Sequence, residues 1–349
     1  MLKNTKQASD LTFIGSGISA SFTLINFLDQ VQKNSLEEKI SINIIDKYPE
    51  FNTGIPYSSR SGFSTLLITS LKNFLPEPVL SKFIVWLNKN KDWLLNEFKE
   101  QGGVLSKKWL DTNKDKIENN DWKTLFLPRR FFGCYINERV NTSIKLLEAE
   151  NKIKVKYIHN EVLDLSKTED NFIISLNNGE SFISKKVILS VGSLPVRNLW
   201  KDSALIEEKQ LMFFNTPYKP ELNATLEKIR AFTTKRKAAN KKTNVLIIGA
   251  NASALEVLYK LNDVSGYCDC NFVFLSTQGK IPDAEIDINR KNEFSAINLN
   301  KLQRKSSLTA KDIADAAHED IAITDEIKLG AASTVDTISS AFGSLLTKL

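Results

Sequence analysis

The chain has 349 residues, of which 42% are hydrophobic and 25% charged, and its net charge is +6. This length and composition indicate a folded protein of about two domains and exclude a disordered chain. No run approaches the roughly 18 apolar residues of a spanning helix, and the opening "MLKNTKQASD" lacks the apolar segment of a secretory signal. The sequence therefore predicts a cytoplasmic protein without a membrane partner.

The first predicted elements form a βαβ unit. Residues 11–14 and 40–45 are short, apolar and rich in β-branched side chains, as buried strands are. Residues 18–33, between them, have the apolar spacing of a helix.

Two longer helices are expected next. The first covers Pro76 to Phe98, and another follows "FLPRRFFGCY" and runs to about Glu150. The side chains expected in the core from the first are Phe83, Trp86, Leu87, Trp93 and Leu94.

The pattern then changes to short alternating segments. "KVKYI", "VLDLS", "NFIISLNN" and "SFISKKVILSV", within 154–191, alternate like antiparallel strands, and "LNNGES" has the Asn and Gly of a hairpin turn. Residues 202–242 are expected to be helical and linker-like.

The opening pattern returns at residue 243. "TNVLIIGANASALEVLYKL" predicts a strand, a glycine turn and a helix, and "CNFVFLS" at 270–276 predicts a further strand. Two copies of one supersecondary unit are less readily explained by chance than a single glycine-rich turn.

The first copy has the residues that a pyrophosphate requires at a helix start, where backbone N–H groups must approach closely. In the first copy Gly15 would make the tight turn, Gly17 would let the backbone touch the phosphates, and Ala20 would let helix and strand pack. Ser19 would add a hydroxyl contact. Asp46, at the end of the second strand, is placed to accept hydrogen bonds from a ribose, or else is a strand-end acid facing water.

Several segments, in order, resemble a known family. "GIPYSS" (54–59), "FLPRRFFGCYI" (126–136), "VILSVGSLP" (187–195) and "STQGKIP" (276–282) follow one another as in FAD/NAD(P)-binding flavoproteins of the FAD-NAD(P)-binding type. That group is distantly similar to lysine and ornithine N-hydroxylating monooxygenases and to other single-component FAD monooxygenases. The resemblance covers about residues 10–290.

The resemblance implies FAD as the cofactor of the first copy. Gly15, Gly17, Ser19 and Ala20 would hold its pyrophosphate, and Asp46 its adenosine ribose. The remaining implied contacts are Gly54 and Tyr57 beside the flavin, Arg129 or Arg130 offering positive charge to phosphate or flavin, Val162 meeting the adenine, and Gly192 where the chain returns over the cofactor.

The resemblance also implies that the second copy binds NADH or NADPH through Gly249, Asn251 and Ser253. Asn251 replaces the second glycine of the pattern. Thr277 and Gln278 stand where relatives commonly have an arginine suited to the 2′-phosphate of NADPH, which favours NADH.

The implied fold class is α/β: a Rossmann-like FAD-binding domain with antiparallel insert strands, and a second, smaller Rossmann-like domain. The expected domains are 1–200 with a helical insertion at about 60–125, a linker with helices over 201–242, a nicotinamide nucleotide unit over 243–300, and a helical segment over 301–349. That last segment resembles only the beginning of a longer region in relatives.

The implied function is an NAD(P)H-dependent, monooxygenase-like FAD oxidoreductase acting on a small molecule. The alternatives are an FAD oxidase or dehydrogenase without a nicotinamide site, and a non-catalytic flavin-binding partner protein. The sequence identifies no catalytic residue and no substrate, and leaves open whether the chain forms a homo-oligomer or binds a protein partner.

Other chemistry has little support in the sequence. Cys134, Cys268 and Cys270 form neither a redox pair nor a metal-ligand series, and His159 and His318 stand alone, so no metal is expected. The basic run at 234–242 is more typical of a solvated linker than of a nucleic-acid site.

Overall fold

The computed structural model describes residues 8–34, 38–192, 211–218, 221–263, 270–276 and 288–322. The chain divides into two compact units, Met1–Lys235 and Arg236–Leu349. The finer boundaries expected from the sequence stay a prediction.

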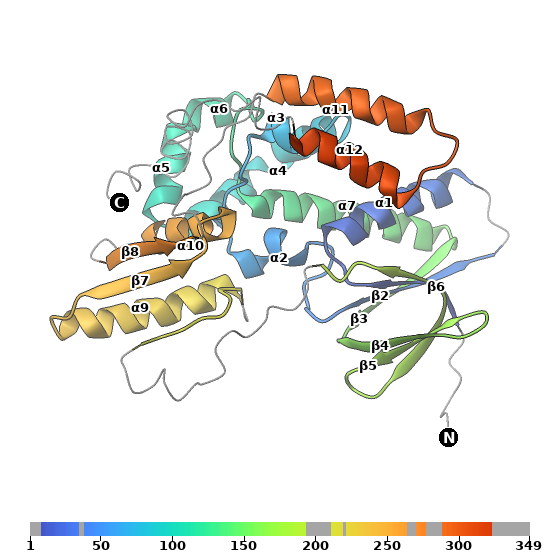
Figure 1. Ribbon diagram of the computed structural model, residues 1–349, viewed down its shortest axis with the longest axis horizontal. Coiled ribbons are helices and arrows are strands. Elements are labelled where there is room, and N and C mark those ends of the chain that lie inside the picture. Colours follow the sequence, from blue (N-terminus) through green and yellow to red (C-terminus); the bar gives the residue numbers. More distant parts are fainter. Residues whose placement is uncertain are drawn as a thin grey trace. The chain divides into compact units, whose positions relative to one another are not determined.

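The first unit is built on a six-stranded sheet with strand order β3-β2-β1-β6-β5-β4 (Figure 1). β3, β2, β1 and β6 run parallel to one another, and β5 and β4 continue from β6 as an antiparallel meander. The strands are β1 (Ser9–Ile14), β2 (Ile40–Asp46), β3 (Ile153–His159), β4 (Val162–Lys167), β5 (Phe172–Leu176) and β6 (Ser181–Leu189). The expected α/β class with antiparallel insert strands is confirmed.

The segment 154–158 was expected among the antiparallel strands, and this is wrong. It lies in β3, which pairs parallel with β2 from Ile40↔Ile153 to Asp46↔His159. The alternation of apolar and polar residues along one strand does not show the direction of the neighbouring strand. A helix precedes β3, as it does in a crossover between parallel strands. The hairpin at "LNNGES" is confirmed, because Gly179, with φ of 81°, closes the turn between β5 and β6.

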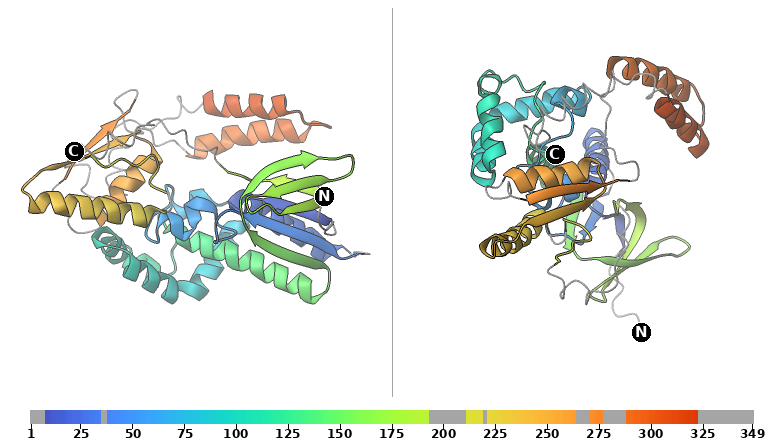
Figure 2. Two further views of the ribbon diagram at one scale, coloured as in Figure 1. Left: turned by 90° about the horizontal axis from the view of Figure 1, so that it is seen from below. Right: turned by 60° about the vertical axis from the view of Figure 1, so that its left-hand side comes forward.

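Helices cover one face of this sheet. α1 and α7 pack on each other, and α4 packs on α7 (Figures 1 and 2). The helices of this region are α1 (Ile18–Lys33), α2 (Gly54–Tyr57), η1 (Ser59–Ser61), α3 (Leu71–Phe74), α4 (Val79–Gln101), α5 (Val104–Thr112), α6 (Lys114–Glu118) and α7 (Arg129–Ala149). α7 does not follow "FLPRRFFGCY" but begins inside it at Arg129, because Pro128 supplies a fixed φ immediately before the first turn.

The meander covers the other face at the carboxyl ends of the strands. Ile14, Ile45 and Ile158 pack there against Ile174 and other apolar side chains of β5 and β6. Both faces are therefore apolar at that end, which explains the consecutive buried pair Ile44 and Ile45 in β2.

The expected core residues of the long helix are buried except for one. Phe83, Trp86, Leu87 and Leu94 contribute to the main core, whereas Trp93 is 44% exposed. Its ring lies at the margin of the buried face, perpendicular to that of Trp86.

The second unit contains the expected second copy. β7 (Thr243–Ile248) and β8 (Cys270–Leu275) form a parallel pair, and α10 (Ala252–Asp263) connects to β7 through a glycine turn and lies alongside the pair (Figure 2). α11 (Ile288–Gln303) and α12 (Ala310–Ala322) pack on each other. α9 (Leu222–Ala238) spans the boundary between the units and accounts for the helical part expected within 202–242.

Thr277, Gln278, most of "STQGKIP" and residues beyond 322 lie outside the described residues. Within the described part of the chain, no helix is both long and apolar enough to cross a membrane.

Candidate functional site

The glycine turn after β1 lies at the carboxyl edge of the parallel strands. Gly15 has φ of 92°, and its N–H donates to the carbonyl of Ile45 at 2.8 Å. A Cβ at Gly15 would lie 2.2 Å from the carbonyl oxygen of Ser190, in the segment after β6. Gly15 is therefore required by the packing of the chain itself.

At Gly17, by contrast, the packing of the described residues does not require a glycine. Its φ is −72°, which any residue adopts, and the one described atom that a Cβ there would meet is the Cα of Gly54, at an ordinary 3.7 Å. Neither backbone conformation nor neighbouring atoms exclude a side chain, so what Gly17 provides is open backbone at the start of α1.

The start of α1 offers backbone donors. Gly17 is the N-cap residue, and within the described part of the chain no side chain caps the helix. The first N–H groups of a helix have no partner within it, and they carry its partial positive charge. Ser19 is exposed in this first turn, while Ala20 is 3% exposed and packs in the core between helix and sheet.

Asp46 lies where expected, at the end of β2, and contacts the glycine turn. Its Oδ2 accepts hydrogen bonds from the N–H of Ser16 at 2.7 Å and from the Ser16 hydroxyl at 2.8 Å. Its Oδ1 accepts one from the N–H of Tyr48 at 2.9 Å.

Gly54 also lies against the glycine turn. With φ of 63°, it begins α2, and a Cβ on it would lie 3.1 Å from the Cα of Gly17. Tyr57, at the end of α2, is partly buried, with its ring 5.3 Å from that of Phe132. Burial raises the pKa of Tyr57, and the charge of Arg129 offsets this only in part, so the phenol keeps its proton at neutral pH.

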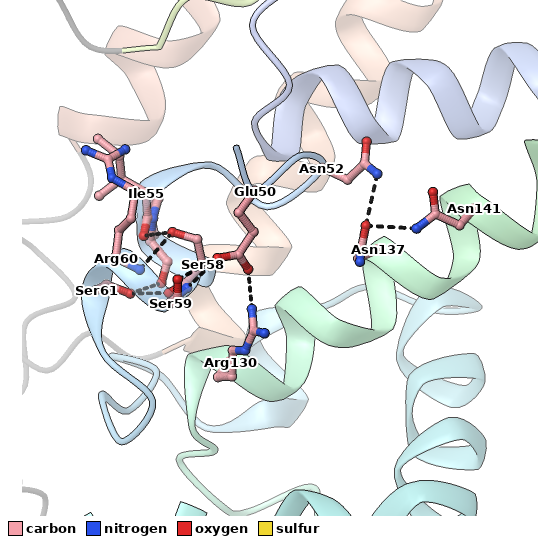
Figure 3. Close-up of polar contacts among 11 residues, drawn as sticks. Glu50, Asn52, Ile55, Ser58, Ser59, Arg60, Ser61, Arg130, Asn137 and Asn141 are labelled. Carbon is pink, nitrogen blue, oxygen red and sulfur yellow. Dashed lines mark hydrogen bonds and ion pairs between the residues drawn. The ribbon is translucent and has the colours of Figure 1, made fainter. Parts of the chain in front are cut away.

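The two arginines begin α7 and are both engaged with the chain. The Nε of Arg129 donates to the carbonyl of Leu66 at 3.1 Å. Arg130 forms an ion pair with Glu50, whose other oxygen accepts from the N–H and hydroxyl of Ser59 (Figure 3). The positive charge of Arg130 thus fixes the segment after β2.

Cys134, one turn further along α7, is not an activated nucleophile. Burial raises the pKa of its thiol to about 11, so the thiol stays protonated at neutral pH. Among the described residues, no three His, Cys, Asp or Glu side chains gather as metal ligands would.

Val162 and Gly192 come from the meander. Val162 begins β4 opposite Leu176, next to a bulge. Gly192 follows β6 with φ of 73°, and no atom of the described residues lies within 4 Å of its Cβ position. Two residues earlier, the Ser190 N–H donates to the Ile14 carbonyl at 2.8 Å, which holds this segment against the glycine turn.

The second copy repeats the geometry of the first. Gly249 has φ of 104°, and its N–H donates to the carbonyl of Leu275 at 2.8 Å, as that of Gly15 does to Ile45. The helix start differs, because the Asn251 side chain accepts a hydrogen bond from the N–H of Ala252 at 2.8 Å. Ser253 is exposed in the first turn of α10.

Asn52 connects the site to the core and was not found from the sequence. It is 2% exposed with φ of 69°, a conformation that Asn tolerates better than most residues. Its side chain donates to Asn137 of α7 at 3.0 Å (Figure 3) and to the Tyr157 hydroxyl at 3.3 Å, and its carbonyl accepts from Ser21 of α1 at 2.8 Å. A lone Asn in a loop has no periodicity or motif that would have revealed it.

Comparisons with known proteins agree with this geometry. The pattern of the FAD-NAD(P)-binding family matches residues 12–194, more than half of the chain. Uncharacterized proteins of Mycobacterium tuberculosis and Mycobacterium bovis are 28% identical over 99% of this chain, which spans 65% of their length.

Two solved structures are similar over nearly the whole chain. An ornithine hydroxylase from Pseudomonas aeruginosa has a TM-score of 0.51 at 15% identity, covering 98% of this chain and 70% of that one. An FAD-bound cadaverine monooxygenase from Erwinia amylovora has a TM-score of 0.46 at 14% identity, covering 98% and 66%.

Together the sheet, the two glycine turns and the family pattern define a dinucleotide-binding protein of Rossmann-like fold. The chain belongs to the FAD-NAD(P)-binding family. This confirms the expected cofactor class, FAD with NAD(P). The uncapped α1 and the open backbone at Gly17 fit the pyrophosphate of such a cofactor.

Proposed function

We propose that the chain is an FAD-dependent oxidoreductase of the monooxygenase-like kind, which uses NADH or NADPH and acts on a small molecule. The observation that carries the proposal is Gly17. A glycine that the fold itself does not require stands at the uncapped start of α1, where a diphosphate needs bare backbone.

The proposed roles of the site residues are in binding the cofactor rather than in acid–base chemistry. The turn from Gly15 to Ala20 would bind the FAD pyrophosphate, and the Asp46 carboxylate would accept a hydrogen bond from the adenosine ribose. Gly54 and Tyr57 would lie beside the flavin, and the aromatic side chains behind Tyr57 would exclude water from it. When bound, flavin supplies the redox chemistry, accepting a hydride and passing electrons to oxygen.

One similar structure supports the proposed monooxygenase-like activity. The ornithine hydroxylase, whose fold is similar over 98% of this chain, is by name an enzyme that hydroxylates ornithine. Since the chain spans 65% of the length of its curated relatives, the substrate and activity of the whole protein are part of the proposal.

The test is an absorption spectrum of the purified protein, followed by anaerobic mixing with NADH and with NADPH. We expect a yellow protein with bound FAD that bleaches with NADH faster than with NADPH, and that consumes oxygen when air is admitted. A protein that retains no FAD after reconstitution would contradict the proposal.

One observation favours a second candidate, an FAD oxidase or dehydrogenase without a nicotinamide site. Asn251 replaces the second glycine, and its side chain takes up the first helical N–H of α10. Under this alternative the bound FAD stays oxidised with either nicotinamide nucleotide and is bleached by substrate. Stable yellow colour under all conditions would instead indicate a non-catalytic flavin-binding protein.

A further inference from the structure

Ser16, the residue between the two glycines, makes an unusual set of contacts. Both its N–H and its hydroxyl donate to Oδ2 of Asp46, at 2.7 and 2.8 Å. Ser16 is 2% exposed, and its two bonds to the half-buried Asp46 are partly buried. Hydrogen bonds to a charged group in such surroundings are stronger than those between neutral groups.

The Ser16 hydroxyl is also an acceptor. The N–H of Asn52 points to it at 3.4 Å, and the Asn52 side chain continues to Asn137 and Tyr157. Because the hydroxyl has a single hydrogen, accepting from Asn52 is compatible with donating it to Asp46. The direction of the Ser16 hydroxyl, and with it that of the carboxylate, is therefore fixed from the core.

These contacts limit what Asp46 has left for a ligand. A carboxylate has about four lone-pair positions, of which Oδ2 uses two for Ser16 and Oδ1 uses one for Tyr48. A second acceptor position on Oδ1 is the one not taken up by these bonds.

We propose that Ser16 is a positioning residue for the adenosine half of the cofactor: it orients the Asp46 carboxylate so that Oδ1 receives a single ribose hydroxyl. This inference rests on the proposed FAD site. It adds a specificity rule, since one acceptor position recognises one of the two ribose hydroxyls and leaves the other to water.

The chain contains a matched control. Ser41 makes the same pair of bonds to Asp10, from its N–H at 2.8 Å and its hydroxyl at 2.7 Å, at the amino ends of β2 and β1. Ser41→Ala thus removes the same kind of bond from the same sheet at the end remote from the glycine turn.

The experiment measures the affinity for ADP, as a probe of the adenosine half, and for FMN, which lacks that half. We expect Ser16→Ala to bind ADP about tenfold more weakly than the wild type, with unchanged affinity for FMN. Ser41→Ala should bind ADP as the wild type does. In the Asp46→Asn background, Ser16→Ala should weaken ADP binding no further, because Ser16 acts through Asp46.

The specificity rule is tested with 2′-deoxy-ADP and 3′-deoxy-ADP. One of the two should bind the wild type about as well as ADP, and the other about tenfold more weakly. Equal losses for both analogues would overturn the single-hydroxyl rule.

Additive losses from Ser16→Ala and Asp46→Asn, or an unchanged ADP affinity in Ser16→Ala, would overturn the positioning role. If Ser16→Ala does not fold, Ser16→Cys keeps the size of the side chain with a weaker donor and permits the same comparison. A wild-type protein that binds ADP but cannot be reconstituted with FAD would contradict the proposed function and leave the role of Ser16 standing.

Discussion

Gly15 and Gly17 lie two residues apart in one turn, and the structure gives them different reasons to be glycine. Gly15 combines φ of 92° with a Cβ position that overlaps the Ser190 carbonyl, whereas Gly17 has neither restriction. Substituting each glycine in turn therefore separates the effect on stability from the effect on cofactor binding.

We expect Gly15→Ala to lower the free energy of unfolding by about 3 kcal/mol, from left-handed strain and steric overlap. The free energy of unfolding of Gly17→Ala should lie within about 1 kcal/mol of the wild-type value. This variant should nevertheless retain little FAD, because the methyl group occupies the space through which the pyrophosphate reaches the helix start. Denaturant unfolding of the apoproteins and flavin absorbance after reconstitution measure the two effects. A Gly17→Ala protein with a full complement of FAD would show that the turn does not hold the pyrophosphate.

A second prediction at this scale concerns pH. Burial alone would raise the pKa of Asp10, but hydrogen bonds from Lys185 and Ser41 outweigh it and hold that pKa at about 2. A depressed folded-state pKa contributes stability above the unfolded pKa, near 4, and loses it as the pH falls toward 2. Asp10→Asn should therefore be less stable than the wild type at pH 6, with the difference narrowing below about pH 4. Urea unfolding of both proteins at pH 6, 4 and 3 measures this difference in the free energy of unfolding. A difference that stays constant with pH would contradict the role assigned to Asp10.

At the scale of elements, α7 is held by an aromatic cluster around Phe132. Its ring lies near those of Phe22, Tyr57, Phe74, Phe83 and Tyr135, and it is 2% exposed. We expect Phe132→Ala to cost about 3–5 kcal/mol of stability. The control Trp93→Ala, on an exposed ring, should cost about 1 kcal/mol or less. Equal losses in denaturant unfolding would mean that the cluster is not what fixes α7.

The contact between α7 and α2 gives a further prediction. A Cβ at Gly133 would lie 2.0 Å from the carbonyl oxygen of Tyr57, so the helix approaches that segment through its glycine. Alanine ordinarily stabilises a helix interior relative to glycine, by about 1 kcal/mol. We expect the opposite sign for Gly133→Ala, a loss of about 2 kcal/mol, together with weaker FAD binding because Tyr57 is displaced.

Gly179→Ala is the control for that change. Gly179 has φ of 81°, and no atom of the described residues lies within 4 Å of its Cβ position, so the substitution should cost about 1 kcal/mol and leave FAD binding unchanged. A stabilising Gly133→Ala would show that α7 and α2 do not pack this closely.

At the scale of the whole molecule, two glycine turns of the same geometry lie in two separate units. They differ in Asn251, whose side chain takes up the N–H of Ala252. We expect Asn251→Gly to raise the affinity for NADH by about fivefold, because it frees that N–H, while FAD content stays unchanged. Titration with NADH at fixed FAD occupancy measures this. No gain in affinity would argue that the second turn is not a nucleotide site.

Local signals were enough for the glycine turns and for most elements. The strand–glycine–helix pattern placed β1, α1 and β2, and later β7 and α10, because a turn of this type depends on residues that are adjacent in sequence. Asp46 was also placed correctly at a strand end. The direction of β3 and the exposure of Trp93 were not, because each depends on a neighbour distant in sequence.

The sequence by itself determined that this chain has two strand–glycine–helix turns and an acid at the end of β2, since these follow from apolar period and backbone freedom. Only the tertiary structure decided that Gly15 serves the fold, that Arg130 is paired with Glu50, and that Ser16 and Asn52 tie the turn to α7. The physical reason is that hydrogen bonds and steric overlap act between atoms brought together across the sheet, and no periodicity along the chain records which polar residues will meet.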